Sequence, residues 1–308
     1  MRKTCLDMVY ELACKDPRIF FIGSDLGIDT LNQFKKEMPD RFFMEGVSEA
    51  NLIGMAAGLA LEGKIVYANT IATFITRRCF DQVAIDLCLH QAKVRLIGNG
   101  GGLVYALLGP THTALEDIAI FRALPNMTIL VPADAEEMRR MMPATVDWPG
   151  PIYIRVAKGG DPVVTQGLPA FQIGKSFPMR EGKDALLVTT GVMLKRTLDA
   201  ADLLKTKGIE TAVLHVPTVK PLDKTAILDY SSRVPVIVSV EEHTIIGGLG
   251  SAVAEVLAEA NFRTPKRFKR LGVPDVFADQ YGSQDSLMSR YGLTAQVIGE
   301  TIEQLSRA

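Results

Sequence analysis

The first half of the sequence alternates short apolar runs with amphipathic segments, a pattern typical of strands and helices in alternation. The apolar run at residues 19–22 predicts a strand buried on both faces, and further strands are predicted at 41–47, 65–69, 94–98, 128–132 and 152–156. Helices are predicted near the N-terminus and at residues 31–38, 49–62, 78–90, 115–123 and 135–146. Repeated strand–helix–strand order favours right-handed crossovers and therefore parallel sheets.

The stretch 158–183 loses this alternation and is rich in Gly, Pro and Gln, which indicates a domain boundary. A second series follows, with strands at 185–190, 211–216, 236–240 and 268–272 and helices at 194–207, 224–230, 251–260 and 295–305. The sequence therefore predicts an α/β protein with two doubly wound domains. We place them at residues 1–165 and 184–308, joined by a linker over 166–183.

Composition narrows the function classes. The length of 308 residues fits two domains, and 47% hydrophobic with 22% charged residues is typical of a globular chain. A net charge of -1 gives no overall field that would attract nucleic acid or an anionic membrane. The one basic cluster, residues 263–270, is interpreted as a solvated strand edge. We expect neither nucleic acid nor membrane as a partner.

The four cysteines form no Cys-x-x-Cys pair and have no nearby pair of histidines, so neither a zinc site nor a disulfide framework is predicted. The N-terminal segment carries charges throughout, unlike a signal peptide. No apolar run approaches the roughly 18 residues that span a bilayer. Together these features predict a cytoplasmic protein with no metal ligand set of its own.

Ligands of open parallel sheets bind beyond the carboxyl ends of the strands, so the turns there hold the candidate residues. Glu49 follows Ser48, a predicted N-cap, and on position alone it is either a carboxylate that complements the helix dipole or a catalytic group. His112 is either a turn histidine or a catalytic one. The glycines of 98–102 lack the P-loop lysine and the G-x-G-x-x-G spacing, which favours a flexible loop, and 247–250 is similar.

Several segments taken together resemble one known family. The segments FMEGVSEANLIGMAAGLALEG, ATFITRRCFDQV, GPTHTALEDIAIFRALPNMTILVPADAEE and GPIYIRV resemble the pyrimidine-binding domain of the transketolase family of thiamine diphosphate enzymes. The segments VIVSVEEHTIIGGLGSAVAEVLAE and RLGVPDVFADQYGSQDSLMSRYGLTAQVI resemble that family's C-terminal domain. In transketolases and deoxyxylulose-phosphate synthases, a domain that holds the diphosphate and metal precedes these two. The chain is thus similar to the C-terminal subunit of a split transketolase, whose cofactor site another polypeptide completes.

The resemblance implies roles for particular residues. Glu49 matches the glutamate that hydrogen-bonds the cofactor's pyrimidine nitrogen and promotes its activation. Phe74 matches the aromatic residue that stacks on the pyrimidine, with a core phenylalanine as the alternative. Asp25 matches an aspartate near the thiazolium ring, and a turn cap is its alternative. Between Phe74 and Phe80 the chain is one residue longer than the synthase pattern, so Arg78 is a further cofactor-binding candidate whose register the sequence leaves open.

Two more residues match substrate-binding positions of the family. His112 matches the histidine that meets the reacting end of the substrate. Arg155 matches an arginine that grips a substrate phosphate or carboxylate, a task that suits its forked donors, while a salt bridge is the alternative.

The chain also departs from the family pattern. Leu107 and Leu108 stand where related enzymes have an acidic residue that binds a sugar hydroxyl, and Gly100-Gly101 stands where transketolases have a phosphate-binding histidine. An apolar side chain leaves such a hydroxyl unpaired. The sequence therefore favours a donor and acceptor other than the ordinary sugar-phosphate pair, for example a 2-oxoacid such as pyruvate as donor.

The resemblance further implies thiamine diphosphate as cofactor, with Mg²⁺ or Ca²⁺ held by the partner subunit. Pyrimidine-binding domains of the family pair with each other, which predicts an α2β2 assembly with the small-residue helix 49–62 near the contact. The predicted activity is transfer of a two-carbon ketol or acyl unit from a ketose or 2-oxoacid to a carbonyl acceptor. Two alternatives stay open: the beta subunit of a 2-oxoacid dehydrogenase, and a non-catalytic assembly subunit.

Overall fold

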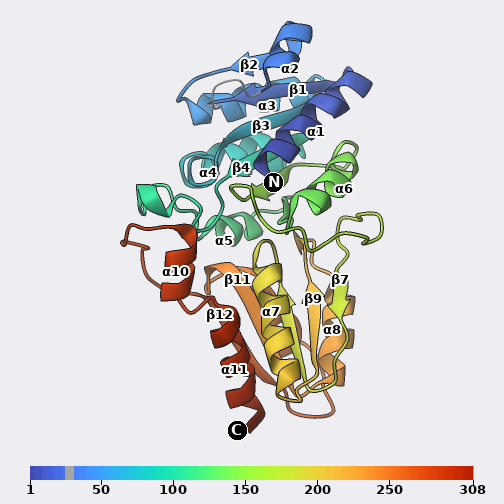
Figure 1. Cartoon of the computed structure of the whole chain (residues 1–308). Coiled ribbons are helices and arrows are strands. Elements are labelled where there is room, and N and C mark those ends of the chain that lie inside the picture. Colours follow the sequence, from blue (N-terminus) through green and yellow to red (C-terminus); the bar gives the residue numbers. More distant parts are fainter. Residues whose placement is uncertain (25–30, 308) are drawn as a thin grey trace.

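The computed structural model describes residues 1–24 and 31–307, which form two stacked α/β domains (Figure 1). The first domain is built on a seven-stranded sheet of order β10-β5-β6-β4-β3-β1-β2. Its strands are β1 (Ile19–Gly23), β2 (Phe42–Met44), β3 (Ile65–Ile71), β4 (Val94–Asn99), β5 (Thr128–Leu130), β6 (Ile152–Val156) and β10 (Thr218–Lys220). All neighbours are parallel except β10 and β5.

Helices cover both faces of this sheet. They are α1 (Arg2–Lys15), α2 (Asn32–Glu37), α3 (Glu49–Leu61), α4 (Phe80–Gln82), α5 (Asp117–Arg122) and α6 (Ala135–Thr145), with short 3₁₀ turns η1 (Pro39–Arg41) and η4 (Ala106–Leu108). One buried cluster joins α1 and α6 to the sheet, and a second joins α3 and the segment after β3 to its other face. Across the described residues, none of the helices has the length and apolar character needed to cross a membrane.

The helix predicted at 78–90 is instead broken into π-helical segments. These are η2 (Phe74–Arg78) and η3 (Val83–Leu89), separated by the single turn of α4. The hydroxyl of Thr76 donates to the carbonyl of Ala72, four residues back, at 2.8 Å. Wide π turns of this kind are frequent at functional sites.

The second domain has a five-stranded sheet of order β12-β11-β8-β9-β7. Its strands are β7 (Phe177–Arg180), β8 (Ala185–Thr189), β9 (Thr211–His215), β11 (Val236–Thr244) and β12 (Arg267–Val273), and its helices are α7 (Met193–Thr206), α8 (Lys224–Arg233), α9 (Leu249–Ala258), α10 (Gln284–Arg290) and α11 (Ala295–Arg307). Helices α7 and α11 pack on one face of the sheet, and α8 and α9 pack on the other (Figure 1). The predicted fold class, two α/β domains with mostly parallel sheets, is confirmed.

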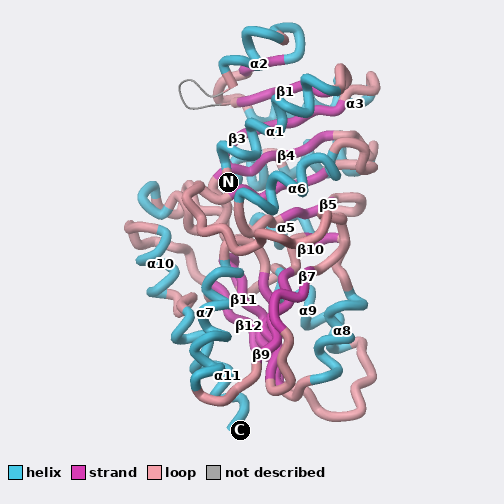
Figure 2. The backbone as a smooth tube through the Cα atoms, turned by 45° about the vertical axis from the view of Figure 1, so that its right-hand side comes forward, coloured by secondary structure: helices cyan, strands magenta, loops and turns pink. Residues whose placement is uncertain are grey.

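Two strands differ from the prediction. β7 lies inside the stretch predicted as a linker and pairs antiparallel with β9. β10 was not predicted at all, and it leaves the second domain to pair antiparallel with β5 of the first sheet (Figure 2). Val219 in β10 is 1% exposed and packs into the core of the first domain. The second half of the chain therefore contributes to both sheets.

Candidate active site

The carboxylate of Glu49 lies at the N-terminal turn of α3, which follows the short strand β2. Ser48 occupies the N-cap position as predicted, but its hydroxyl donates to the carbonyl of Glu45 at 2.8 Å and makes no cap hydrogen bond to the helix. Glu49 itself is 3% exposed. The helix dipole favours a negative charge at this position. The carboxylate accepts a hydrogen bond from a donor on another element.

That donor is Arg78 at the end of the π-helical segment η2. Its Nη1 donates to Oε2 of Glu49 at 2.7 Å. The same guanidinium lies over the ring of Phe74, with Cζ 4.4 Å from the ring centroid. The Arg78 side chain is 48% exposed, so it reaches into the site from the solvent side. Glu49, Arg78 and Phe74 therefore form one contiguous group.

His112 extends this group from the loop between β4 and α5. Its ring lies 5.2 Å from that of Phe74 and at 65° to it, an edge-on arrangement. The hydroxyl of Thr111 lies 2.9 Å from Nδ1 of His112. The structure thus brings together four of the predicted residues through successive contacts: Glu49 with Arg78, Arg78 with Phe74, and Phe74 with His112.

Arg77 is a contributor that the sequence analysis missed. Its Nη2 donates to the carbonyl of Thr113 at 3.0 Å and its Nη1 to that of Pro110 at 3.3 Å, while Nε pairs with Glu116. The two consecutive arginines therefore divide their work: Arg78 contacts Glu49, and Arg77 holds the loop that carries His112. The Arg-Arg pair stood in the motif that carried the resemblance, but only the three-dimensional structure separates the two roles.

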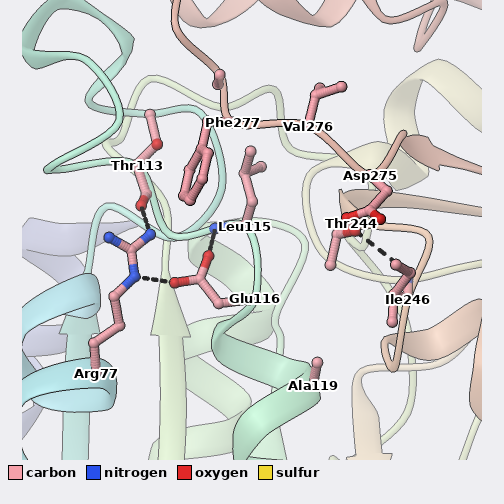
Figure 3. Close-up of a pocket in the computed structure, with 11 residues that line it drawn as sticks. Arg77, Thr113, Leu115, Glu116, Ala119, Thr244, Ile246, Asp275, Val276 and Phe277 are labelled. Atoms are coloured by element: carbon pink, nitrogen blue, oxygen red, sulfur yellow. Dashed lines mark hydrogen bonds and ion pairs between the residues drawn. The ribbon is translucent and has the colours of Figure 1, made fainter.

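A cavity of about 420 Å³ lies beside this loop, between the two domains (Figure 3). Arg77, Thr113 and Glu116 come from the first domain, and Ile246, Val276 and Phe277 are among the residues from the second. Glu49, Phe74 and His112 are not in its lining. The cavity therefore adjoins the candidate site without containing it.

Arg155 lies at the end of β6, where it is 6% exposed and bound by protein groups. Nε donates to Oδ2 of Asp117 at 2.7 Å, and Nη2 donates to the carbonyls of Ala114 and Glu242 at 3.0 and 2.9 Å. Burial works to raise the pKa of Asp117, but the charges of Arg155 and His243 and the hydrogen bonds from Arg155 and Tyr153 together hold that pKa below its usual value. Substrate binding by Arg155 stays a prediction, and these contacts make it a residue of the domain interface.

The remaining candidates lie elsewhere. Asp25 lies outside the described residues. Leu107 and Leu108 are exposed in η4, in the same loop as His112. The glycines that predicted a flexible loop are instead closely packed: a Cβ on Gly100 would come within 2.0 Å of the Tyr105 ring, and one on Gly101 within 2.5 Å of the Arg155 side chain. Glycine is needed there because neighbouring side chains fill the space.

The geometry of the group fits the pyrimidine end of thiamine diphosphate. The planar guanidinium of Arg78 stacks on the ring of Phe74 and donates a hydrogen bond to Glu49. A planar heterocycle that carries a hydrogen-bond donor toward Glu49 could make the same two contacts in its place. On the β3–η2 segment, Asn69 Nδ2 and Thr73 Oγ1 are buried without a hydrogen-bond partner in the described structure. Over residues 1–24 and 31–307, no cluster of three or more acidic, Cys or His side chains is arranged to hold a metal ion.

Comparison with known proteins agrees with this geometry. Residues 1–160 match the pyrimidine binding domain of transketolase, and residues 174–298 match the transketolase C-terminal domain. The chain is 38% identical over 299 residues to the 6-deoxy-6-sulfo-D-fructose transketolase subunit SqwH of Clostridium sp. (strain MSTE9), covering 97% of this chain and 92% of the relative. It is 35% identical over 302 residues to an apulose-4-phosphate transketolase subunit of Phocaeicola vulgatus, covering 97% of this chain and 95% of that one.

A solved structure is also similar, that of a split gene transketolase described as an inactive beta4 tetramer. The two share 35% identity with a TM-score of 0.90, over 99% of this chain and 98% of the other. The chain therefore belongs to the transketolase family, whose members use thiamine diphosphate. The chain carries the family's pyrimidine-binding and C-terminal domains, and over nearly its whole length it is similar to relatives named as transketolase subunits and to the split gene transketolase, so the predicted resemblance is confirmed.

Proposed function

We propose that this chain supplies the pyrimidine-binding half of a thiamine diphosphate site and is active only when a separate subunit supplies the diphosphate-binding half. The complex transfers a two-carbon ketol unit from a donor to a carbonyl acceptor. The observation that carries this proposal is the series of contacts that joins Glu49, Arg78, Phe74 and His112. When bound, thiamine diphosphate supplies a carbanion nucleophile at its thiazolium ring.

Each residue has a task that its contacts support. Glu49 hydrogen-bonds the pyrimidine nitrogen at the position that Arg78 Nη1 fills in this structure. Phe74 offers a flat apolar face to the ring. Arg78 leaves Glu49 as the ring enters, which its half-exposed side chain permits. His112, edge-on to Phe74, hydrogen-bonds the oxygen of the reacting carbonyl.

The diphosphate and its Mg²⁺ or Ca²⁺ are assigned to the partner subunit in this proposal. Self-association is assigned to the face of α3 that carries Gly54 and Gly58, where a Cβ on either glycine would meet nothing within 4 Å. Small residues allow a second backbone to approach closely, so we expect pairing of two chains and an α2β2 assembly. The similar solved structure is described as an inactive tetramer of one kind of subunit, which supports the need for a partner.

The loop of His112 offers apolar side chains to the substrate. Leu107 and Leu108 are 69% and 50% exposed there, and a leucine side chain has no polar group that could bind a sugar hydroxyl. The two relatives named above carry different substrates in their names, a sulfo-sugar and apulose 4-phosphate. We propose a donor and acceptor other than xylulose 5-phosphate with ribose 5-phosphate. Efficient turnover of that ordinary pair in a donor profile would overturn this part of the proposal.

Calorimetric titration for binding and a turnover assay for activity together test the cofactor assignment. Thiamine diphosphate with Mg²⁺ is added to this chain alone, to the diphosphate-binding subunit alone, and to the reconstituted complex. We expect saturable binding and turnover only in the complex. Full activity of either chain by itself, or a complex that does not bind the cofactor, would contradict the two-subunit site.

A further inference from the structure

The loop that carries His112 is closed at its base. Gly102 and Ala114 exchange backbone hydrogen bonds of 2.9 and 3.0 Å, so residues 103–113 leave and return at one point. Within the loop, the backbone N–H of His112 donates to the carbonyl of Gly109 at 3.0 Å. The position of the His112 ring therefore depends on what fixes this base, as well as on Arg77, which binds the carbonyls of Pro110 and Thr113.

A glutamate from the other domain lies against that base. Glu242, near the end of β11, accepts the backbone N–H of Leu103 at 2.7 Å and the side-chain amide of Gln284 at 2.9 Å, both on Oε1. It is 3% exposed. Gly102 has φ +71°, and a Cβ there would lie 2.4 Å from Cδ of Glu242, so the carboxyl group fills the space that a side chain would need.

The opposite strand of the base is held by Arg155. One nitrogen, Nη2, donates both to the carbonyl of Ala114 and to the main-chain carbonyl of Glu242. Leu103 and Ala114, the two sides of the loop base, are thus tied to the same residue of the second domain, one directly and one through Arg155. Neither contact involves Glu49, Arg78 or Phe74.

We propose that Glu242 is a positioning residue, which sets the place of His112 from the second domain and thereby acts on group transfer rather than on cofactor binding. This inference rests on the proposed role of His112. It gives the second domain a part in the reaction, although the candidate residues of the site all lie in the first.

Glu242 holds the loop in either of its charge states. Burial raises its pKa to about 7, although Arg155, the Leu103 N–H and Gln284 lower it; Asp117 raises it further. These are the charged and polar groups that act on Glu242 from the elements packed against it: Arg155 from β6, Leu103 from the loop, Gln284 from α10 and Asp117 from α5. Both hydrogen bonds end on Oε1, which stays an acceptor when the other oxygen carries a proton. Glutamine offers the same acceptor, whereas alanine offers none.

Steady-state kinetics of the reconstituted complex test the proposal with the variants Glu242→Ala, Glu242→Gln and Glu242→Asp. We expect Glu242→Ala to lower kcat by about 10²-fold because His112 is misplaced, with the Kd for thiamine diphosphate unchanged. Glu242→Asp keeps the charge but withdraws it by one methylene from Leu103, so its kcat also falls. Glu242→Gln restores most of the kcat. In a His112→Ala background, Glu242→Ala should cost little more.

Glu241 provides a matched control, because it is a buried neighbour of the same type. It accepts the backbone N–H groups of Leu249 and Gly250 at 2.7 and 2.8 Å, at the start of α9 in its own domain. Glu241→Ala should lower the urea midpoint of unfolding while kcat of the folded complex is kept. The proposal is overturned if Glu242→Ala and Glu242→Asp keep wild-type kcat, if Gln fails to rescue, or if Glu241→Ala loses kcat equally. A wild-type complex without cofactor binding would instead refute the proposed function.

Discussion

Two buried glutamates, one from each domain, share the same burial and differ in what satisfies them. Glu49 and Glu242 are each 3% exposed. Glu49 is paired with a guanidinium whose side chain is half exposed, whereas Glu242 is held by a backbone N–H and a side-chain amide. Arg155, the charged group that acts most strongly on Glu242, uses its donors on Asp117 and on main-chain carbonyls.

The difference shows two uses of a buried carboxylate: one can exchange its hydrogen-bond partner for a ligand, and the other can anchor a loop. A cation that reaches in from solvent can leave when a ligand brings its own donor, since the guanidinium regains water outside. The backbone N–H of Leu103, a neutral donor, cannot leave Glu242 without moving the loop itself. The first domain therefore has a replaceable partner at its buried carboxylate, and the second has a permanent one.

The largest expected effect comes from removing the exchangeable carboxylate. Glu49→Gln should lower kcat of the complex by about 10³-fold, because the amide cannot take part in the proton transfer that a carboxylate supports. Steady-state turnover of the reconstituted enzyme measures it. The partly exposed Glu45, whose substitution to Gln should leave turnover near wild type, is the control. Full turnover of Glu49→Gln would remove Glu49 from the mechanism.

Asp117 extends the comparison to a carboxylate that is paired permanently with a charge. Asp117→Asn should lower the free energy of unfolding by about 3 kcal/mol, because it leaves the buried Arg155 without its counter-charge. Glu116→Gln removes a partly exposed pair with Arg77 and should cost less than about 1 kcal/mol. Urea unfolding of both variants checks the contrast, and equal losses would contradict it.

The titration of Glu242 gives a pH dependence with a definite sign. Its pKa is about 7 in the folded chain against an ordinary value of 4.5, so between these pH values the folded state binds more protons than the unfolded state. The wild type should therefore lose stability relative to Glu242→Gln as pH rises from 4.5 to 7, by at most about 1.4 kcal/mol per pH unit. Parallel curves of unfolding free energy against pH would show that this carboxyl does not titrate there.

The smallest effect is expected at the amide that completes the anchor. Gln284→Leu removes one of the two donors to Glu242 and leaves the Leu103 N–H in place. A hydrogen bond to a buried acceptor is worth about 1 kcal/mol, which corresponds to a loss of about fivefold in kcat. The same kinetic assay measures it. A loss as large as that of Glu242→Ala would mean that α10, rather than the loop contact, carries the positioning.

The sequence predicted most of the fold because strands buried on both faces and amphipathic helices leave strong local patterns. It could not predict β10, since three residues, Thr218–Lys220, form a strand only through their pairing with β5. It also missed the π-helical breaks around Arg78, because a helical run of side chains does not reveal how wide each turn is.

The same limit explains the site. The resemblance implied roles for Glu49, Phe74 and His112. Glu242 also stood in a segment that resembles the family, but no role came with it and no local signal separated it from Glu241. Successive side chains of a strand point to opposite faces, so one glutamate caps a helix of its own domain and the other reaches the first domain. The available hint to Glu242 in the sequence was the polar run Glu241–His243 at the end of an apolar strand. The structure shows that all three of these residues are buried.

The strand β10 also has a consequence for the order in which the chain folds. Residues 128–130 of β5 leave the ribosome well before residues 218–220 of β10, so the outer side of β5 has unpaired N–H and C=O groups in the interval. Such an open edge can pair with another chain during synthesis. A fragment that stops at the end of the first domain keeps that edge permanently, and we expect it to aggregate where the whole chain stays dispersed.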